Sequence, residues 1–499
     1  MAYMKSYSMQ TSRSSQFIFL ILFVLCYTKG VAQDASSSPY SRFGIGDIQA
    51  AGVTQNLGMG GVNIAMYHPL GLNYSNPAAY GRLQLTTFDA GVNASLMELK
   101  STQKVQSNSD VSLGYFAFAF PLKSRKAGMG FGIVPLSNVG YKINDLQTNS
   151  LGNPELHVYE GSGGLHQFFL STGFTPFRNL TAGVSASYLF GSINQERRVE
   201  FNDASFLNTR LLDTRDQRGF YYTFGLQYTL DSLRISPSDS VADVNHKLEV
   251  AEDSLEMLQH NLKKGVSTDT SRISALQIRM EELEKINCSI HVRHQRGEWN
   301  LVAGFTFSPG SSLNAERSVI ANTFRYLDPF TKEQIVVKDT LYYSTAESGS
   351  IRLPLGYGFG LALRKGNQWI IASDFRLQNW STYRSYGQSD SLANSYRASL
   401  GLQFTPDERG FNSFWNQVNY MAGFHYSNSF LQLRGNQLKE MGISAGLGIP
   451  IRRGLTTIRL MAEAGKRGTT DAGLLEEKYF RFTFGFSLSD RWFIKQRYD

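Results

Sequence analysis

The segment from Tyr479 to Leu488 alternates strictly between apolar and polar residues. Phenylalanines and a leucine occupy every second position from Phe480, whereas arginine, threonine, glycine and serine fill the gaps. A period of two residues predicts a β-strand with two unlike faces. This strand alone leaves open whether a second sheet or membrane lipid covers its apolar face.

The same alternation recurs at 180–191, 351–364, 396–404 and 441–449, where the second face is small or polar. A soluble sandwich needs apolar faces that interlock, whereas a membrane barrel needs them only to contact lipid. The strands have about ten residues or more, which matches a tilted bilayer crossing. The pattern therefore predicts an all-β transmembrane barrel.

From Gln84 onward we expect about fourteen antiparallel strands, an even number as in single-chain bacterial barrels. The sheet must close, because every backbone polar group in hydrocarbon needs a partner. The predicted strand centres are Asp89, Phe116, Ile133, Phe169, Ser185, Phe224, Gly304, Gly358, Phe375, Gly401, Gly423, Ala445, Leu460 and Phe484.

The connections between the predicted strands differ in length. Short connections at 178–180, 365–368 and 452–454 follow even-numbered strands, whereas long polar connections at 194–217 and 318–347 follow odd-numbered strands. This difference predicts short turns in the periplasm and long loops outside the cell.

The chain begins with a predicted signal peptide at residues 1–32. Lys5 and Arg13 precede the apolar run FIFLILFVLC, which is too short to span a bilayer. The sequence Gly30-Val31-Ala32 has the small-x-small pattern of a cleavage site, so the mature chain is expected to start at Gln33.

Charge and cysteine content exclude two classes of protein. The chain has 49 basic and 41 acidic residues, and removal of Lys5, Arg13 and Lys29 with the signal peptide leaves 46 − 41 = +5. This balance is too weak to indicate a nucleic-acid partner. One cysteine, Cys288, remains after cleavage, so the mature chain forms no internal disulfide.

Three stretches carry a family resemblance. They are MGGVNIAM at 59–66, SNPAAY at 75–80 and DFRLQNWSTY at 374–383, which contains Asp374, Trp380 and Ser381. With them the chain resembles the FadL-type outer-membrane channels for long-chain fatty acids and other hydrophobic compounds. Its SSPYSRFGIGD opening and SDRWFIKQRYD ending resemble the branch found in Bacteroidetes.

The resemblance implies a hatch at 33–83 inside the lumen of a barrel at 84–499. The segment 33–83 is rich in glycine and lacks strand periodicity, so the residues alone also place it inside the barrel rather than across lipid. The resemblance further implies location in the cell outer membrane. Some members of the family act as partners in protein secretion.

Asn76, Pro77 and Ala78 stand in the place of the family's hatch motif. Pro77 holds Asn76 extended and removes one donor, so the tripeptide is predicted to fasten the hatch to the wall. An ordinary turn before a strand is the alternative, because Asn-Pro is a common turn pair.

Pro135 lies inside the predicted third strand, where a proline removes a ladder donor and marks a bulge. The resemblance implies a kink there that opens the wall sideways to lipid. A plain strand end at Pro135 is the alternative.

Asp374 and Arg376 share the inward face of their predicted strand. One interpretation is an ion pair between wall and hatch, and the other is a polar lining of the lumen for solute.

Residues 236–287 are predicted to insert a helical hairpin into the barrel on the periplasmic side. Apolar residues at 241–262 and 273–283 follow the three- and four-residue spacing of a coiled coil, with a break at Gly265. The hairpin either packs against itself or docks a periplasmic partner.

Neither a metal site nor an active site is expected, and no cofactor. The spacing of His291 and His294 near Cys288 sends the two imidazoles to opposite faces of a strand. No nucleophile elbow lies near the remaining strand and loop histidines.

Two functions therefore remain. The first is passive uptake of hydrophobic compounds such as long-chain fatty acids, with outer-membrane lipid and hydrophobic small molecules as partners. The second is a scaffold subunit that docks a protein secretion or assembly machine through the hairpin.

Overall fold

The computed structural model describes residues 38–69, 71–102, 104–148, 152–201, 203, 205–230, 254, 274–276, 278–282, 299–328, 334–407, 414–451 and 456–490. The predicted signal peptide and the cluster of Cys288, His291 and His294 lie outside these residues. So does most of 236–287, although the described residues 254, 274–276 and 278–282 are helical. None of the described helices has the length and apolar character needed to cross a membrane.

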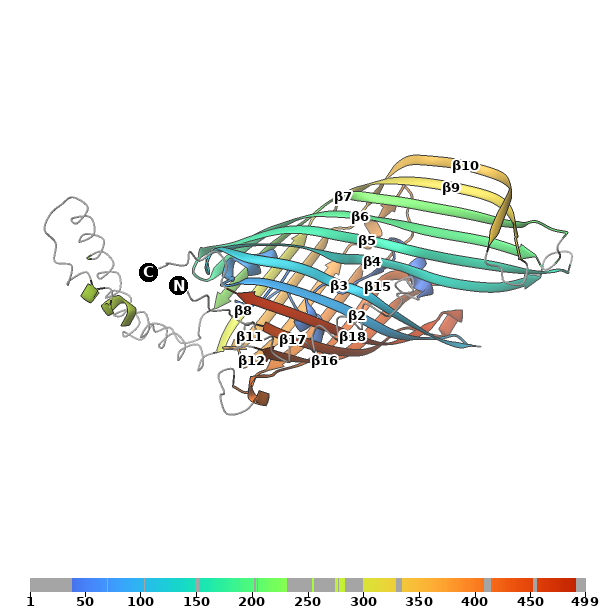
Figure 1. Cartoon of the computed structure of the whole chain (residues 1–499). Helices are drawn as coiled ribbons and strands as arrows, with labels where there is room; N and C mark the ends of the chain where they lie inside the picture. The colour runs from blue at the N-terminus through green and yellow to red at the C-terminus, as the bar shows by residue number, and fades with distance from the viewer. Residues whose placement is uncertain are drawn as a thin grey trace, which may run out of the picture. The chain divides into compact units, whose positions relative to one another are not determined.

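The described strands form one antiparallel sheet within the compact unit Ala35–Asp499 (Figure 1). The sheet closes where β18 pairs with β2, from Asp490 opposite Thr86 to Glu476 opposite Lys100. Its strands are β2 (Thr86–Lys100), β3 (Val105–Lys123), β4 (Ala127–Thr148), β5 (Pro154–Phe177), β6 (Leu180–Phe201), β7 (Asn208–Leu230), β8 (Trp299–Ser308), β9 (Ser312–Tyr326), β10 (Ile335–Arg352), β11 (Gly356–Lys365), β12 (Trp369–Gln378), β14 (Ser395–Phe404), β15 (Asn419–Leu433), β16 (Asn436–Ile451), β17 (Thr456–Gly468) and β18 (Glu476–Asp490).

These strands make fourteen wall crossings, which confirms the predicted closed barrel. Two crossings consist of two strands each. One crossing consists of β8 followed by β9, and both of these strands pair with β7. The next crossing consists of β10 followed by β11, of which β10 pairs with β9 and β11 pairs with β8. Both crossings are interrupted at a proline, Pro309 in one and Pro354 in the other.

The faces of the last strand agree with the expected alternation. Phe482 and Phe484 point outward with about half of their surface exposed, 49% and 48%. Thr483 is buried on the inner face, and its hydroxyl lies 2.8 Å from the side-chain oxygen of Asn93 on β2. Large apolar side chains on the outer faces of neighbouring strands repeat this exposure, which is typical of a surface in contact with lipid.

The prediction of long loops at 194–217 and 318–347 is wrong. Residues 194–201 and 208–217 belong to β6 and β7, whereas 318–326 and 335–347 belong to β9 and β10. These strand ends have polar residues on both faces, so the alternation that identifies a strand in lipid is absent there. Backbone pairing alone continues the sheet.

The described residues of 38–83 lie against the inner face of the wall. They form η1 (Pro39–Arg42), β1 (Asp47–Ile48), α2 (Thr54–Gly58) and η2 (Pro77–Arg82), and most of their side chains are buried. The remaining short elements are η3 (Trp380–Thr382), β13 (Arg384–Ser385), η4 (Phe414–Gln417) and η5 (Asp471–Gly473). We call residues 38–83 the inner segment.

Candidate functional site

The inner segment contains two helical turns that begin in the same way. Ser38 and Asn76 are the N-caps of η1 and η2, each is followed by a proline, and each side chain accepts a backbone N–H two residues on. Proline is favoured at the first helical position because its missing N–H would have no partner there. Local sequence therefore determines where both turns begin.

Asn76 is fully buried and contacts both the inner segment and the wall. Its side-chain oxygen accepts the Ala78 N–H at 3.0 Å, and its amide nitrogen donates to the carbonyl of Ile64 at 2.7 Å. The same nitrogen lies 3.4 Å from the carbonyl of Leu226 on β7. Pro77 and Ala78 are buried beside it.

Asp374 and Arg376 point inward from β12 to the MGGVNIAM stretch. One carboxylate oxygen of Asp374 accepts the backbone N–H groups of Asn63 at 2.6 Å and Ile64 at 2.9 Å. The Arg376 guanidinium donates to the side-chain oxygen of Asn63. Both side chains therefore hold the inner segment. The Trp380 ring, beyond the end of β12, stacks on Phe430 with 4.5 Å between centroids.

Sequence reasoning did not identify two further wall residues that hold the inner segment. The Gln227 amide donates to the carbonyls of Ile64 at 2.9 Å and Met66 at 3.1 Å. The Ser444 hydroxyl accepts the Gly60 N–H at 2.9 Å and donates to the Gly58 carbonyl. The available signal was a polar residue on an otherwise glycine-rich inward face.

Inward-facing glycines let the inner segment approach the wall backbone directly. A methyl group added at Gly423 would lie 2.0 Å from the Gly60 nitrogen, and one at Gly304 would lie 2.4 Å from the Ile64 oxygen. Both separations are far below van der Waals contact, so any larger residue displaces the segment. The same close contact with segment backbone occurs at Gly128, Gly173, Gly183, Gly360 and Gly401.

The pairing between β3 and β4 breaks off near Pro135 and does not resume in the part of β4 that follows this proline. In the described chain, the two strands pair from Phe116 opposite Ile133 to Lys123 opposite Ala127, and no pairing joins 105–115 to 134–148. β4 continues through Pro135 to Thr148 and remains paired with β5, with a register shift between Pro135 and Ser137. We call the interval between 105–115 and 134–148 the seam.

The inner segment occupies the first part of the freed edge of β4. Asp47 and Ile48 of β1 pair with Asn138 and Ser137, and the Ser137 hydroxyl donates to the Ile45 carbonyl at 2.6 Å. Further contacts come from the Gln49 N–H, which donates to the Leu136 carbonyl at 3.0 Å, and from the Ser41 hydroxyl, which accepts the Gly140 N–H at 3.1 Å. The inner segment therefore supplies partners to this edge at residues 136–138 and 140. β3 has no such partner in the described residues, and its side chains Val111 and Leu113 are 69% and 60% exposed.

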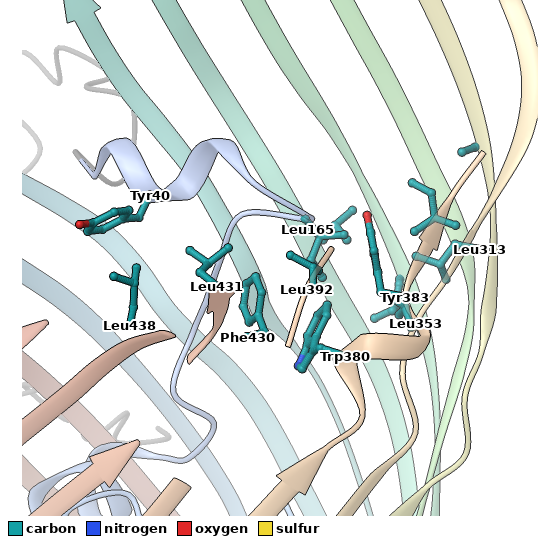
Figure 2. Close-up of a cluster of buried hydrophobic side chains, with 14 of the residues drawn as sticks. Tyr40, Leu165, Leu313, Leu353, Trp380, Tyr383, Leu392, Phe430, Leu431 and Leu438 are labelled. Carbon is teal, nitrogen blue, oxygen red and sulfur yellow. The ribbon is translucent and has the colours of Figure 1, made fainter. Parts of the chain in front are cut away.

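A large apolar cluster lies inside the barrel next to the seam (Figure 2). Leu136 of β4 and Ile48 of β1 pack against it, which connects the cluster to the seam. Its buried members come from the inner segment, the wall and the connections around η3 and η5. They are Tyr40, Ile45, Leu165, Leu189, Leu313, Ala315, Ile351, Leu353, Trp380, Tyr383, Leu392, Phe430, Leu431, Leu438 and Leu474.

Comparison with protein-family models identifies the family of this chain. A family model described as BamG matches residues 15–250 and 255–499, which is nearly the whole chain. The chain belongs to the BamG family. A search of curated protein sequences gave no match for this BamG-family chain.

Several solved structures resemble this chain at low identity, and one of them has a TM-score above 0.5. A TodX deltaS2S3 mutant, named a monoaromatic hydrocarbon channel, is 13% identical with a TM-score of 0.52, over 88% of this chain and 99% of the other. The Pseudomonas putida toluene transporter TodX is 13% identical with a TM-score of 0.49, over 89% and 98%. A Pseudomonas aeruginosa FadL homologue is 10% identical with a TM-score of 0.48, over 89% and 99%.

The BamG-family chain is thus an outer-membrane β-barrel of FadL-like fold. The predicted likeness to the Bacteroidetes branch stays a prediction, as does the helical hairpin at 236–287.

Proposed function

We propose that the chain is an outer-membrane channel for passive uptake of small hydrophobic compounds, which leave the lumen sideways through the seam. The observation that carries the proposal is the seam itself, which opens one wall strand beside a large apolar cluster. In this proposal residues 33–83 are the hatch, with Asn76, Pro77 and Ala78 as its anchor and Pro135 as the kink.

The chemistry of the cluster suits an apolar solute. Each methylene moved from water into an apolar site contributes about 0.8 kcal/mol, so affinity rises with chain length until the site is full. A sideways exit delivers the solute to membrane lipid without a second transfer through water. Long-chain fatty acids and monoaromatic compounds both have this chemistry, and the FadL-like fold supports the proposal at the level of architecture.

The test compares two prolines in the wall. Pro135→Val restores a donor at the seam, whereas Pro450→Val is a matched control because Pro450 lies in β16 opposite Thr457, where pairing with β17 is continuous. Uptake of a series of fatty acids and alkylbenzenes into proteoliposomes is measured for both variants. We expect Pro135→Val to reduce uptake several-fold and Pro450→Val to leave it unchanged.

Two results contradict the proposal. One is equal uptake by wild type, both variants and protein-free liposomes. The other is an equal loss in both variants, which assigns the effect to general damage. Heat-modifiable mobility on gels checks that each barrel is closed.

A scaffold role is the second candidate, and the close filling of the lumen favours it. The backbone of the inner segment touches glycines on many wall strands, so the described residues hold the segment firmly in place. In this role the hairpin at 236–287 docks a secretion or assembly machine in the periplasm. Deletion of 241–286 separates the two functions, because it spares uptake by a channel and abolishes the cellular phenotype of a scaffold.

A further inference from the structure

A groove of about 730 Å³ lies on the barrel wall over the adjacent strands β15, β16, β17, β18, β2 and β3. Outward-facing apolar side chains line it, and two lysines and a glutamate stand among them. The apolar members are Leu96, Phe424, Met441, Ile443, Ala464 and Phe480. Five of these are between 38% and 63% exposed, namely Leu96, Phe424, Met441, Ile443 and Phe480, so the groove opens toward lipid.

The two lysines of the groove form an unfavourable pair. Lys466 on β17 lies directly opposite Lys478 on β18, and both are exposed. Like charges directly opposite each other on one sheet face repel. Glu98 on β2, opposite Lys478, lies 3.5 Å from its ammonium, so one carboxylate faces two cations. A further anion at this position would relieve the repulsion.

The positive charge continues along the same outer face. Lys439 stands two residues from Met441 on β16, and Lys100 stands two residues from Glu98 on β2. Glu476, opposite Lys100, is the other carboxylate of this row. Four lysines and two glutamates leave a net charge of 4 − 2 = +2 directly beside the apolar outer surface.

The height of this row matches the outer edge of the bilayer. Lys478 lies twelve residues from Asp490, which pairs with Thr86 at the end where the wall begins and ends. At about 3.3 Å per residue this is about 40 Å along the strand, or about 30 Å along the barrel axis at a tilt near 40°. That distance equals the thickness of the hydrocarbon core, about 30 Å. With both wall ends on the periplasmic side, the lysines reach the outer headgroups.

We propose that this groove binds a phosphorylated, multiply acylated glycolipid of the outer leaflet. Its phosphate lies between Lys466 and Lys478, and an acyl chain lies along Ile443, Met441 and Phe480. Continuity with the lipid-facing surface provides the apolar contact, and the unbalanced lysine pair provides the charge complementarity. The site lies on the outside of the wall and is independent of uptake through the lumen.

The experiment measures lipid retained by the full chain purified in detergent. Micelles are doped with diphosphoryl lipid A, with its dephosphorylated form or with dioleoyl phosphatidylglycerol, and retained lipid is quantified by mass spectrometry after gel filtration. The variants are Lys466→Gln and the double variant Lys466→Gln with Lys478→Gln. Lys365→Gln is the control, because Lys365 is the last outward-facing residue of β11 and lies at the end of the barrel opposite to Lys478.

We expect wild type and Lys365→Gln to retain diphosphoryl lipid A equally. Lys466→Gln is expected to retain about fivefold less and the double variant about 25-fold less, the effect of removing one or two cations near an anionic headgroup. Closed barrels shown by heat-modifiable mobility make these comparisons valid, and the exposed Lys466→Gln change leaves the wall intact.

Three results overturn the proposal. Equal retention of diphosphoryl lipid A by wild type and the double variant would show that the lysines form no site. Retention of the dephosphorylated form equal to that of diphosphoryl lipid A would show that the phosphate is not recognised. Equal retention of phosphatidylglycerol would show that the groove binds any anionic lipid rather than a glycolipid.

Discussion

The wall contains two breaks that differ in what the neighbouring strand does. At Pro309 and Pro354, two adjacent crossings are interrupted at the same level, where Ser308 opposes Gly356 and Ser312 opposes Arg352. The Leu353 N–H donates to the Ser311 carbonyl at 2.7 Å across the interruption. Pairing between the two crossings therefore resumes on both sides.

At Pro135, only β4 changes its course. β3 stays paired with β2 as far as Val105, and β4 stays paired with β5 as far as Thr148. Each strand therefore keeps the neighbour on the side away from the seam. The seam results because the two strands follow different neighbours. A break shared by both strands preserves the wall, whereas a break in one strand opens it.

The largest effect is expected from the buried wall contacts that hold the inner segment at β12. Asp374→Ala leaves the N–H groups of Asn63 and Ile64 without their buried acceptor and removes the carboxylate beside Arg376. We expect a loss of about 3–5 kcal/mol in the free energy of unfolding. Denaturant unfolding followed by tryptophan fluorescence measures it. Ser373→Ala, on the opposite face of β12, should change stability by less than about 0.5 kcal/mol.

A charge placed on the outer face should distinguish continuous wall from seam. Phe482 and Val111 both lie opposite Ala94, one on each side of β2. Phe482→Arg enters continuous wall and should cost about 2–4 kcal/mol, whereas Val111→Arg lies on the part of β3 that borders the seam and should cost about 1 kcal/mol or less. Folding titrations into lipid vesicles measure both. Equal costs would contradict an open seam at Val111.

Loss of the hydroxyl at Ser137 should loosen β1. Ser137→Ala leaves the buried Ile45 carbonyl without its donor, at a cost of about 1–3 kcal/mol. We expect faster hydrogen exchange at residues 45–49. Ser171→Ala is the control, because its hydroxyl bonds Ser185 within the wall at 2.8 Å. Unchanged exchange in Ser137→Ala would show that β1 is held by other contacts.

The smallest effect is expected from the prolines themselves. Pro135→Val supplies one donor to an edge that lacks a wall partner, worth about 0.5–1.5 kcal/mol if β3 accepts it. Pro354→Val changes a strand whose neighbour is interrupted at the same level, so pairing should stay as it is. Hydrogen exchange at 105–115 reports on both variants. Slower exchange in Pro354→Val alone would reverse the comparison.

The sequence predicted most of the wall, because lipid and lumen impose opposite demands on the two faces of a strand. Each predicted strand centre, from Asp89 to Phe484, lies inside a strand. The extensions at 318–347 were missed because both faces there are polar. The missing pairing between β3 and β4 could not be predicted from residue alternation, because each strand alone has the pattern of a wall strand.

The candidate site could be predicted only in part. Inward parity placed Asp374 and Arg376 on the lumen side, and local turn chemistry placed Asn76 at the start of η2. Their partners could not be found from spacing, because the contact between Asn63 and Asp374 joins residues 311 positions apart. Alternating glycines were visible, but the approach of Gly60 to Gly423 depends on how the whole barrel closes.

The inner segment remains attached to the wall, because η2 ends at Arg82 and β2 begins at Thr86. The wall therefore carries its own intramolecular ligand on a tether of three residues, 83–85. A short tether of this kind gives an effective concentration in the millimolar range or above. If a solute or one weakened contact displaced the inner segment, the segment would rebind the wall faster than a free competitor present at a lower concentration. The inner segment therefore keeps the lumen occupied.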